Sequence, residues 1–441
     1  METLHPSFEQ FKLNRQLLNA IEEAGYTEPT EVQQQTIPLA LAGHDVLGIA
    51  QTGTGKTAAY ALPILMKVKY AKEGNPRALI LAPTRELVLQ ITGVISHLGK
   101  YTGIRCLSLI GGSSIKTQVE AVKAGVDILI STPRRFMDIY LTGDLVVKQL
   151  EAMVLDEADK MMDMGFMPQI RSILEVIPRK RQNLLFSATF QERVERLSHE
   201  FLEFPMKVEI TPSATTAERV EQQLYEVPNF RTKINLVEHL IVQPEFEKVL
   251  IFARSRETAE NIYKFLSRKV LGEENVKVIH ANKGQNTRLN AMDAFRSGEV
   301  KVLVATDVAS RGIDITAVTH VINFDVPLIY EDYVHRIGRT GRASLSGQAV
   351  TFMTMSDAWH IKKIEEIIRM EIPKADIPAG VDMAVTPKEE LQVMLKEIDN
   401  QKRKDNPEFK GAFHEKKKRS FKPAGSGAGK KSASGKSRQR R

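Results

Sequence analysis

Cysteine is almost missing from this chain of 441 residues, because Cys106 stands alone and leaves no partner for a disulfide within the chain. Aromatic residues are scarce as well, at 6% with one tryptophan. No apolar run approaches the roughly 20 residues of a membrane span, and Met1 to Gln10 lacks the basic and apolar regions of a secretory signal. These absences predict a cytoplasmic protein with no membrane partner, in which Cys106 is a packed thiol.

Most of the chain has no net positive charge, although the formal net charge of the whole chain is +8. Residues 401–441 hold 15 Lys/Arg and 3 Asp/Glu, a balance of +12, whereas residues 1–400 hold 47 and 51, a balance of −4. The tail is rich in Gly, Ser and Lys, so we expect it to be disordered from about residue 401 and to attract polyanions in a salt-sensitive way. A folded basic nucleic-acid domain is not supported.

A glycine-rich loop follows the strand predicted for Asp45 to Ile49 and precedes a helix running toward Leu65. Its sequence departs from the pattern G-x-x-x-x-G-K-[ST] only at the first position: Ala50, Gln51, Thr52, Gly53, Thr54, Gly55, Lys56 and Thr57. The glycines let backbone N–H groups face phosphate oxygens, the lysine can reach the β- and γ-phosphates, and the threonine can bind Mg²⁺. A structural glycine turn is the alternative.

Two acids, Asp156 and Glu157, follow the apolar run Ala152 to Leu155, which is typical of a buried strand in a parallel sheet. Such sheets bind ligands at the carboxyl ends of their strands. Opposite a phosphate loop, one carboxylate can hold Mg²⁺ while the next orients and deprotonates a water, so Asp156 is the metal candidate and Glu157 the base. An acidic surface loop is the alternative for an isolated pair.

A glutamine upstream of the loop, Gln33, lies in the first turn of the helix predicted for Glu31 to Leu41. Its amide offers a donor and an acceptor, which match the exocyclic amine and N7 of adenine. An exposed helical glutamine is the alternative. Before it, Phe8 to Ala24 shows helical spacing, and Gly25 is a natural stop.

Three more predicted strands end in βα turns that can take a phosphate at a helix N-terminus or at close-approaching backbone. The strands are Ala78 to Leu81, Cys106 to Ile110 and Asp127 to Ile130, and the turns that follow them are Pro83-Thr84-Arg85, Gly111-Gly112 and Thr132-Pro133-Arg134.

The chain is predicted to divide near residue 210, in the α/β class. A first domain, 1–210, is followed by a polar linker, 211–222, a second domain, 223–375, and an extension, 376–441, with a helix at 389–401. The second domain shows its own βα series, with strands at 249–252, 276–280, 300–305 and 320–324 and helices at 255–267, 287–295 and 357–369. It has no phosphate loop.

Together these motifs resemble the DEAD-box ATP-dependent RNA helicases of superfamily 2, over roughly residues 5–375. Phe8, Gly25, Tyr26, Pro29 and Gln33 match the adenine-reading Q motif. The other matches are Asp156-Glu157-Ala158-Asp159, Ser187-Ala188-Thr189, Ala305 to Asp314, and His335 to Arg342. The resemblance implies two tandem RecA-like domains with parallel sheets and one ATP between them, with the second domain supplying charge in trans.

The resemblance also implies roles for residues at each motif. Asp159 and Ser187 to Thr189 would couple hydrolysis to strand separation, with His335 linked to them, and Asp314 would bind ribose. Arg336, Arg339 and Arg342 recur every three residues, so on a helical stretch they would share one side, and the last two would be the fingers that reach the γ-phosphate.

The RNA backbone would be held by both domains. The implied contacts are Pro83, Thr84, Arg85, Gly111, Gly112, Thr132, Pro133, Gln285, Arg288, Thr306, Arg311 and Gly312. Arg134 stands where the family usually has glycine, so a phosphate contact and a solvent-facing side chain both stay open. His280-Ala281 and Ser255 also depart from the usual pattern, which leaves the contacts near them open.

The implied activity is that of an RNA-dependent ATPase that unwinds short RNA duplexes or remodels RNA–protein complexes by lobe closure on single-stranded RNA, with ATP and Mg²⁺. The compact form with a short basic tail resembles bacterial members. We expect a monomer whose partner is RNA, with ribosomal particles or RNA-decay proteins as further candidates. An ATP-gated RNA clamp with slow turnover and a DNA translocase are the alternatives. The RNA target stays open, since backbone contacts carry no base information.

Overall fold

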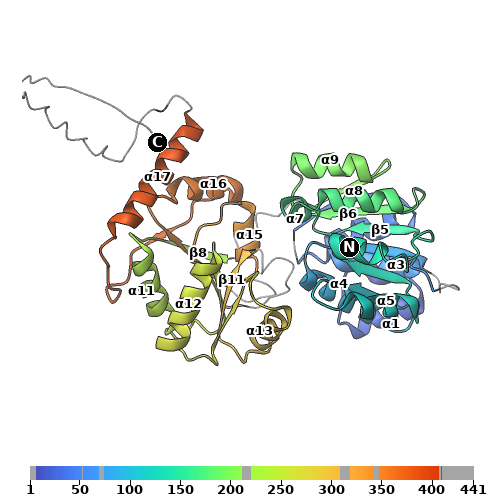
Figure 1. Ribbon diagram of the computed structural model, residues 1–441, viewed down its shortest axis with the longest axis horizontal. Helices are drawn as coiled ribbons and strands as arrows, with labels where there is room; N and C mark the ends of the chain where they lie inside the picture. Colours follow the sequence, from blue (N-terminus) through green and yellow to red (C-terminus); the bar gives the residue numbers. More distant parts are fainter. Residues whose placement is uncertain are drawn as a thin grey trace, which may run out of the picture. The chain divides into compact units, whose positions relative to one another are not determined.

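Two parallel sheets of seven strands each form the frame of the protein (Figure 1). The computed structural model describes residues 6–51, 53–68, 74–210, 220–307, 318–340, 347–406 and 409. Within these residues the first sheet has the order β3-β4-β2-β5-β6-β1-β7 and the second β10-β11-β9-β12-β13-β8-β14. When the strands of each sheet are counted along the chain, both orders are the same permutation, so the two halves repeat one topology, as the sequence predicts.

The first half alternates strands and helices from residue 8 to residue 209. Its elements are η1 (Phe8–Phe11), α1 (Arg15–Glu23), α2 (Glu31–Leu41), β1 (Val46–Ile49), α3 (Lys56–Lys67), β2 (Ala78–Leu81), α4 (Arg85–Leu98), β3 (Cys106–Leu109), α5 (Ile115–Lys123), β4 (Ile128–Ser131), α6 (Pro133–Tyr140), β5 (Ala152–Leu155), α7 (Ala158–Asp163), α8 (Met167–Val176), β6 (Gln182–Ser187), α9 (Glu192–Phe201) and β7 (Met206–Glu209).

The second half repeats the alternation. Its elements are β8 (Val220–Glu226), α11 (Phe230–Ile241), β9 (Val249–Ala253), α12 (Arg256–Lys269), β10 (Val276–Ile279), α13 (Gln285–Ser297), β11 (Val302–Thr306), β12 (His320–Asn323), α15 (Glu331–Ile337), β13 (Gly347–Met353), α16 (Ala358–Ile368), β14 (Lys374–Ala375) and α17 (Lys388–Asp405). None of the helices in the described ranges combines the length and apolarity that crossing a bilayer requires.

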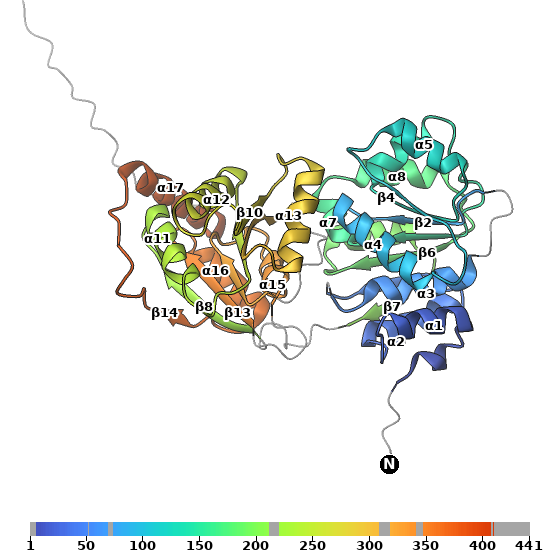
Figure 2. The ribbon, with the colours of Figure 1, turned by 90° about the horizontal axis from the view of Figure 1, so that it is seen from below.

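The inner strands of the first sheet send alternate side chains into two separate cores, because successive residues of a strand point to opposite faces. On β2, Ile80 packs with helices α1 to α4, whereas Leu79 and Leu81 pack with helices α5 to α9. Figure 2 shows these helix layers on the two sides of the first sheet. Burial on both faces explains why inner strands such as β5, with Ala152 to Leu155, are apolar along their whole length.

The predicted N-terminal helix is wrong in one respect, because it is interrupted. The 3-10 turn η1 ends at Lys12, whose φ of 53° lies in the left-handed region, and Asn14 then begins α1 by accepting a hydrogen bond from the N–H of Leu17 at 2.9 Å. Side-chain spacing alone does not show the break, since Phe11 and Leu17 are buried on either side of it.

The domain limits also differ from the predicted ones. Strand β8 begins at Val220, so the last three residues of the expected linker belong to the second sheet, and residues 211–219 lie outside the described part. Residues up to Val385 form one unit with the sheets, because Asn229 Nδ2 donates to the carbonyl of Ala384 at 2.6 Å, and a second unit begins at Thr386. Helix α17 continues to Asp405, beyond residue 401, and almost all of the basic tail lies outside the described residues.

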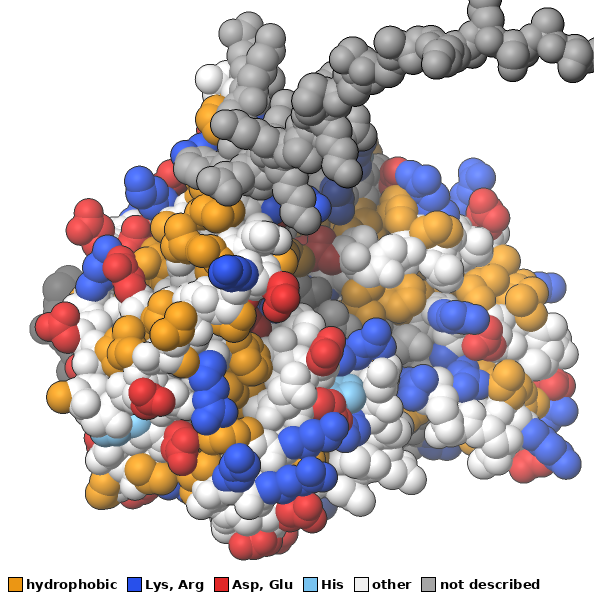
Figure 3. Space-filling model, turned by 60° about the vertical axis from the view of Figure 1, so that its left-hand side comes forward, with side chains coloured by type: hydrophobic (Ala, Val, Ile, Leu, Met, Phe, Trp, Pro, Cys, Tyr) orange, Lys and Arg blue, Asp and Glu red, His pale blue; other side chains and the backbone are white. Residues whose placement is uncertain are grey.

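Acidic and basic side chains are interspersed on the face of the molecule shown in Figure 3, with no single broad area of one charge. This pattern agrees with the balance of −4 over residues 1–400. Any anion-binding capacity on this face therefore has to come from local groups.

One glycine of β1 is required by the packing of the first sheet. A Cβ added to Gly48 would lie 2.5 Å from two ring atoms of Phe186 on the neighbouring strand β6. We expect Gly48→Ala to lower the free energy of unfolding by roughly 1–3 kcal/mol, because the ring has to move in a packed core. Urea unfolding of the full chain measures this change.

Gly93→Ala is the matched control. Gly93 lies in α4 with open space around it, and alanine favours helix over glycine by about 1 kcal/mol. The control should therefore gain stability, and a gain for Gly48→Ala as well would contradict the packing argument.

Candidate active site

Three candidate functional segments follow adjacent strands of the first sheet, at the same edge of that sheet. The order β5-β6-β1 places the acid pair after β5, the Ser187-Ala188-Thr189 segment at the end of β6, and the phosphate loop after β1. Ile49 pairs in register with Ser187, and Leu155 with Leu185. Because neighbouring strands are about 4.8 Å apart, the loop and the acids start only about 10 Å from each other.

The phosphate loop has the backbone conformation that its glycines predict. Gly53 and Gly55 have φ values of 85° and 92°, in the left-handed region that glycine adopts without strain. Lys56 is buried at the start of α3, and its Nζ donates to the carbonyl of Ala50 at 2.7 Å. The lysine thus folds back over the loop to the loop's first residue. Thr52 lies outside the described residues.

Gln33 joins helix α2 to the phosphate loop. Its Nε2 donates to the carbonyl of Gly55 at 3.1 Å, and its Oε1 accepts from the backbone N–H of Thr30 at 3.0 Å. Only 4% of the residue is exposed, so the alternative of an exposed helical glutamine is wrong. Nearby, the rings of Phe8 and Tyr26 stack with their centroids 6.3 Å apart.

Asp156 is buried at the end of β5 with both carboxylate oxygens engaged. Oδ1 accepts from the N–H of Glu157 at 2.9 Å, and Oδ2 accepts from the hydroxyl of Tyr60 at 2.9 Å. Burial raises the pKa of Asp156 above its usual range, and the nearby Lys56 opposes this rise. Burial, followed by the charge of Asp156, raises the pKa of Tyr60 well above its usual value, so its hydroxyl stays a donor.

Glu157 is buried too and has an ion-pair partner. Its φ of 54° is unusual for a residue with a side chain, and its Oε1 lies 2.9 Å from Nζ of Lys160. Oε2 is buried without a hydrogen-bond partner among the described residues. The alternative of an acidic surface loop is therefore wrong, because neither acid is exposed.

Asp159 connects the acid pair to β6. Its Oδ2 accepts from the N–H groups of Ala188 and Thr189 at 3.1 and 3.0 Å and from the hydroxyl of Thr189 at 3.2 Å. Burial alone would raise the pKa of Asp159, but the cations of Lys160 and Lys56 outweigh it and hold that pKa below its usual range. The structure thus brings together the two segments to which the resemblance gives a coupling role.

Tyr60 and Lys160 contact the acid pair but were not predicted from the sequence to do so. Lys160 follows Glu157 by three residues, a helical spacing at which opposite charges meet, so that pair was visible in principle. Tyr60 carries no such signal, because it lies in the mostly apolar stretch of α3 and its bond to Asp156 spans 96 residues.

A cavity of about 550 Å³ lies where the three predicted βα turns meet. The Arg85 guanidinium packs against two glycines, since a Cβ on Gly111 or Gly112 would lie 2.8 or 2.7 Å from it. Arg135 donates to the carbonyl of Ser113 at 3.2 Å, while Arg134 is exposed at the rim. The cavity is lined by Pro83, Thr84, Arg85, Glu86, Gly111, Gly112, Thr132, Arg134, Arg135, Asp138, Met164, Phe166, Ala281, Lys283 and Arg288.

Arg288 of α13 reaches this cavity from the second half. Its guanidinium lies 2.8 Å from Oε1 of Glu86, which is buried in the first turn of α4. Residues from both sheets therefore line one cavity. The side chain of Gln285, the residue that begins α13, lies outside the described part.

Of the three arginines predicted to share one side, Arg336 and Arg339 are described, whereas Arg342 lies outside the described residues. Helix α15 ends at Ile337, and the turn that follows keeps these two arginines together: the N–H of Arg339 donates to the carbonyl of Arg336 at 3.1 Å, and both residues line one small cavity. Arg336 is a buried structural residue, because Asp307 takes two of its N–H groups at 2.6 and 2.7 Å. Arg339 donates from Nε to the carbonyl of His335 at 3.3 Å.

The remaining predicted residues of the second half are only partly described. Thr306 is buried at the end of β11, and His335 Nδ1 lies 3.6 Å from a carboxylate oxygen of Asp332. Arg311, Gly312, Asp314 and Arg342 lie outside the described residues.

The donors at the sheet edge suit a magnesium ion held together with a nucleotide. Asp156 offers one buried carboxylate, and Thr57 offers a half-buried hydroxyl in the first turn of α3. Mg²⁺ usually takes one or two carboxylates and completes its shell with phosphate oxygens and waters. A cage of several His, Cys or acidic side chains is not needed, and the described residues contain none.

Two known families match this chain, one over each of its two halves. Residues 30–197 match the family described as DEAD/DEAH box helicase, and residues 232–344 match the helicase conserved C-terminal domain. Among solved structures, Dbp5 of S. cerevisiae bound to RNA and ADP BeF3 is similar with a TM-score of 0.76 and 29% identity, over 84% of this chain and 96% of that one. Mss116 bound to ssRNA and UDP-BeF has a TM-score of 0.77 at 27% identity, over 88% of this chain and 82% of that one.

Curated relatives are similar over most of their length. The DEAD-box ATP-dependent RNA helicase CshA of Streptococcus pneumoniae is 37% identical over 89% of this chain and 73% of its own length. The ATP-dependent RNA helicase RhlB of Pseudomonas putida is 41% identical over 84% of this chain and 94% of its own. Identity at this level across both RecA-like halves shows that the chain is an enzyme and belongs to the family of DEAD-box ATP-dependent RNA helicases.

Proposed function

We propose that this helicase couples ATP hydrolysis to the unwinding of short RNA duplexes or the remodelling of RNA–protein complexes, by closing its two lobes on single-stranded RNA. The observation that carries the proposal is the carboxylate of Asp159, which accepts three hydrogen bonds from Ala188 and Thr189. This contact ties the acid pair, where the phosphate chemistry is proposed, to β6. A movement of the acid pair on hydrolysis would therefore also move the segment that follows β6.

The nucleotide is proposed to bind along the edge formed by β1 and α2. Backbone N–H groups of residues 52–55 would cradle its phosphates, and Lys56 would turn from the carbonyl of Ala50 toward the β- and γ-phosphates. Phe8, Tyr26 and Gln33 would hold adenine. The bond from Gln33 to Gly55 supports this, because it links the base-reading residue to the loop beneath the phosphates. Asp314 would bind ribose.

Mg²⁺ would be held by Thr57 and Asp156. When bound, the ion supplies positive charge to the β- and γ-phosphate oxygens. The carboxylate of Asp156 is already oriented by Tyr60 and by the backbone of Glu157. Little reorganisation of the protein is then required at that position.

Glu157 is the proposed general base, and the proton of the attacking water would pass to Oε2. The contacts distinguish its two oxygens: Lys160 occupies Oε1, whereas Oε2 is buried without a partner in the described part of the chain. Arg339 and Arg342 would supply charge near the γ-phosphate, and His335 would link this site to Asp159 and to Ser187–Thr189. Arginine suits this role because it is always charged and binds phosphate bidentately.

RNA is proposed to bind at the cavity that residues of both sheets line. Backbone N–H groups in the first turns of α4, which follows Thr84, and of α6, which follows Thr132, can donate hydrogen bonds to successive phosphates, although Pro133, the first residue of α6, has no N–H itself. Arg134 would add a contact at the exposed rim. Arg288 would exchange its bond to Glu86 for the RNA backbone, and Gly111, Gly112, Gln285, Thr306, Arg311 and Gly312 would complete the set.

The setting proposed for this activity is the cytoplasm, with the protein acting as a monomer and with ribosomal particles or RNA-decay proteins as candidate partners. The alternative of an ATP-gated clamp is not favoured, because the relatives are named as helicases. RNA-stimulated multiple-turnover ATPase with duplex unwinding in the absence of partners would support the helicase, and stimulation by DNA would support a translocase.

The two site variants that test the chemistry should fail at different steps. Lys56→Ala should weaken nucleotide binding and abolish turnover, because it removes the cation beside the phosphates. Glu157→Gln should keep nucleotide affinity but lose hydrolysis, and it should trap RNA in the closed state. Equilibrium nucleotide binding, ATPase and RNA dissociation rates separate these outcomes. A Glu157→Gln protein that turned over ATP at the wild-type rate would show that Glu157 is not the base.

The ionisation of Glu157, which a base requires, can be tested through Lys160. If the buried carboxylate is charged, Lys160→Met should lower the free energy of unfolding by about 3–5 kcal/mol, because it leaves that charge without a partner. In a Glu157→Gln background the same substitution should cost far less, since the amide is neutral. Equal costs in both backgrounds, measured by urea unfolding, would mean that the pair is not ionic.

Arg134 offers a quantitative test of the RNA surface. One phosphate contact to a single strand contributes about −0.7 to the slope of log affinity against log salt, so Arg134→Gln should flatten that slope by this amount on RNA of any sequence. Arg193→Gln is the matched control, because Arg193 is exposed on α9, away from the cavity. Equal slopes for Arg134→Gln and wild type would indicate that Arg134 faces solvent.

A further inference from the structure

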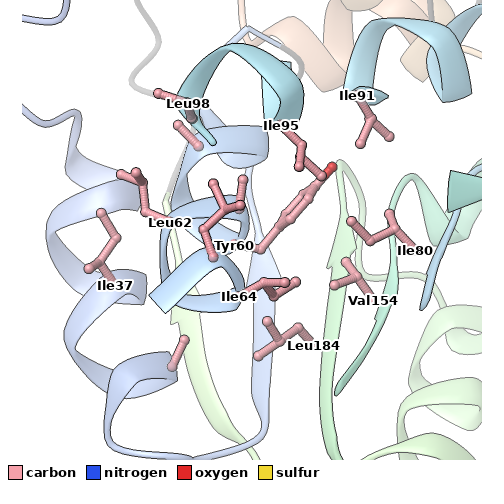
Figure 4. Packing of buried hydrophobic residues seen from close by; sticks show 14 of the residues in the cluster. Ile37, Tyr60, Leu62, Ile64, Ile80, Ile91, Ile95, Leu98, Val154 and Leu184 are labelled. Atoms are coloured by element: carbon pink, nitrogen blue, oxygen red, sulfur yellow. The ribbon is translucent and has the colours of Figure 1, made fainter. Parts of the chain in front are cut away.

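The hydroxyl of Tyr60 contacts the acid pair, although the rest of this side chain is buried in an apolar core. Tyr60 is fully buried, and its ring lies 5.3 Å from that of Phe186. Figure 4 shows the ring among Ile64, Ile80, Ile95 and other apolar side chains, with only its oxygen at the end. Phenylalanine would fill the same space, so packing does not account for the hydroxyl.

The oxygen ends at one of the two residues proposed to hold Mg²⁺. It donates to Oδ2 of Asp156 at 2.9 Å. Thr57 and Tyr60 both belong to α3, three residues apart, whereas Asp156 follows β5. One buried hydroxyl thus connects a helix to the end of a strand at the candidate metal position.

We infer that Tyr60 is a positioning residue for the metal site, whose hydroxyl fixes the carboxylate of Asp156 and thereby sets the affinity for Mg²⁺ in the nucleotide complex. The inference rests on the proposed function, in which Thr57 and Asp156 hold the ion. A carboxylate attached by one rotatable bond to Cβ loses orientational freedom when it binds a metal. The bond from Tyr60, together with the N–H of Glu157, restricts that freedom in advance.

The physical basis is the general effect of groups that hydrogen-bond to metal ligands. Such partners orient the ligand, and losing one typically costs 10–100-fold in metal affinity or activity. Tyr60 differs from Lys56 and Glu157 in that it need not touch nucleotide or water. Its effect should therefore depend on Mg²⁺ and disappear when the ion is removed.

The test is Tyr60→Phe in the full chain, with binding of a fluorescent ADP analogue titrated at increasing Mg²⁺ and in EDTA. We expect the Mg²⁺ concentration at half-effect to rise roughly 10-fold, while ADP affinity in EDTA stays within about twofold because the phosphate loop is untouched. Tyr333→Phe is the matched control: Tyr333 is also fully buried, and its hydroxyl donates to Gln222 at 2.8 Å in the second sheet. It should leave the Mg²⁺ dependence unchanged.

Asp156→Asn separates the inference from the proposed function. If Asp156→Asn leaves the Mg²⁺ dependence of ADP binding unchanged, the proposed metal site is wrong. If Asp156→Asn weakens that dependence and Tyr60→Phe does not, the metal site stands and the role of Tyr60 is wrong. An equal loss of ADP affinity in Mg²⁺ and in EDTA would also overturn the inference, because Tyr60 would then shape the nucleotide pocket. In the Asp156→Asn background, Tyr60→Phe should have no further effect.

Discussion

Three carboxylates buried around the end of β5 impose the constraint on which the active site depends. A buried charge is costly unless hydrogen bonds or an opposite charge compensate it. Asp156 is compensated by Tyr60 and by the backbone of Glu157, Glu157 by Lys160, and Asp159 by the N–H groups that follow β6. These partners come from α3, α7 and β6, so the acids can be buried only if all three elements pack at the edge of the first sheet.

The same contacts leave the three acids with different chemical capacities. Oδ2 of Asp159 is saturated by three donors, so this residue is suited to transmit a change of position rather than to react. Glu157 keeps one oxygen without a partner among the described residues, which suits proton transfer. Asp156 has one donor on each oxygen and can still offer lone pairs to a cation. The acids of one motif thus differ in hydrogen bonding because their neighbours differ.

The second sheet repeats the strand order of the first but uses its edge differently. The first sheet has buried acids at this edge, and Oε2 of Glu157 has no hydrogen-bond partner among the described residues. In the second half, Arg336 donates to Asp307, and Arg339 follows the end of α15. At the cavity that both sheets line, Glu86 neutralises Arg288. Since residues 1–400 carry a balance of −4, an anion bound by this part of the chain has to be held by local groups rather than by an overall field.

The sequence by itself determined the repeated α/β architecture, the phosphate loop and the position of the acid pair, because strand apolarity and glycine spacing are local properties. It also identified the family, because the family's motifs occur in order along the chain. Tertiary structure alone decided that Tyr60 meets Asp156 and that Gln33 bonds to Gly55, since these contacts depend on how distant elements pack. It also decided that α15 ends before Arg339, which the spacing of the arginines does not show. The break between η1 and α1 was missed for a similar reason, because a single left-handed residue, Lys12, leaves the hydrophobic spacing intact.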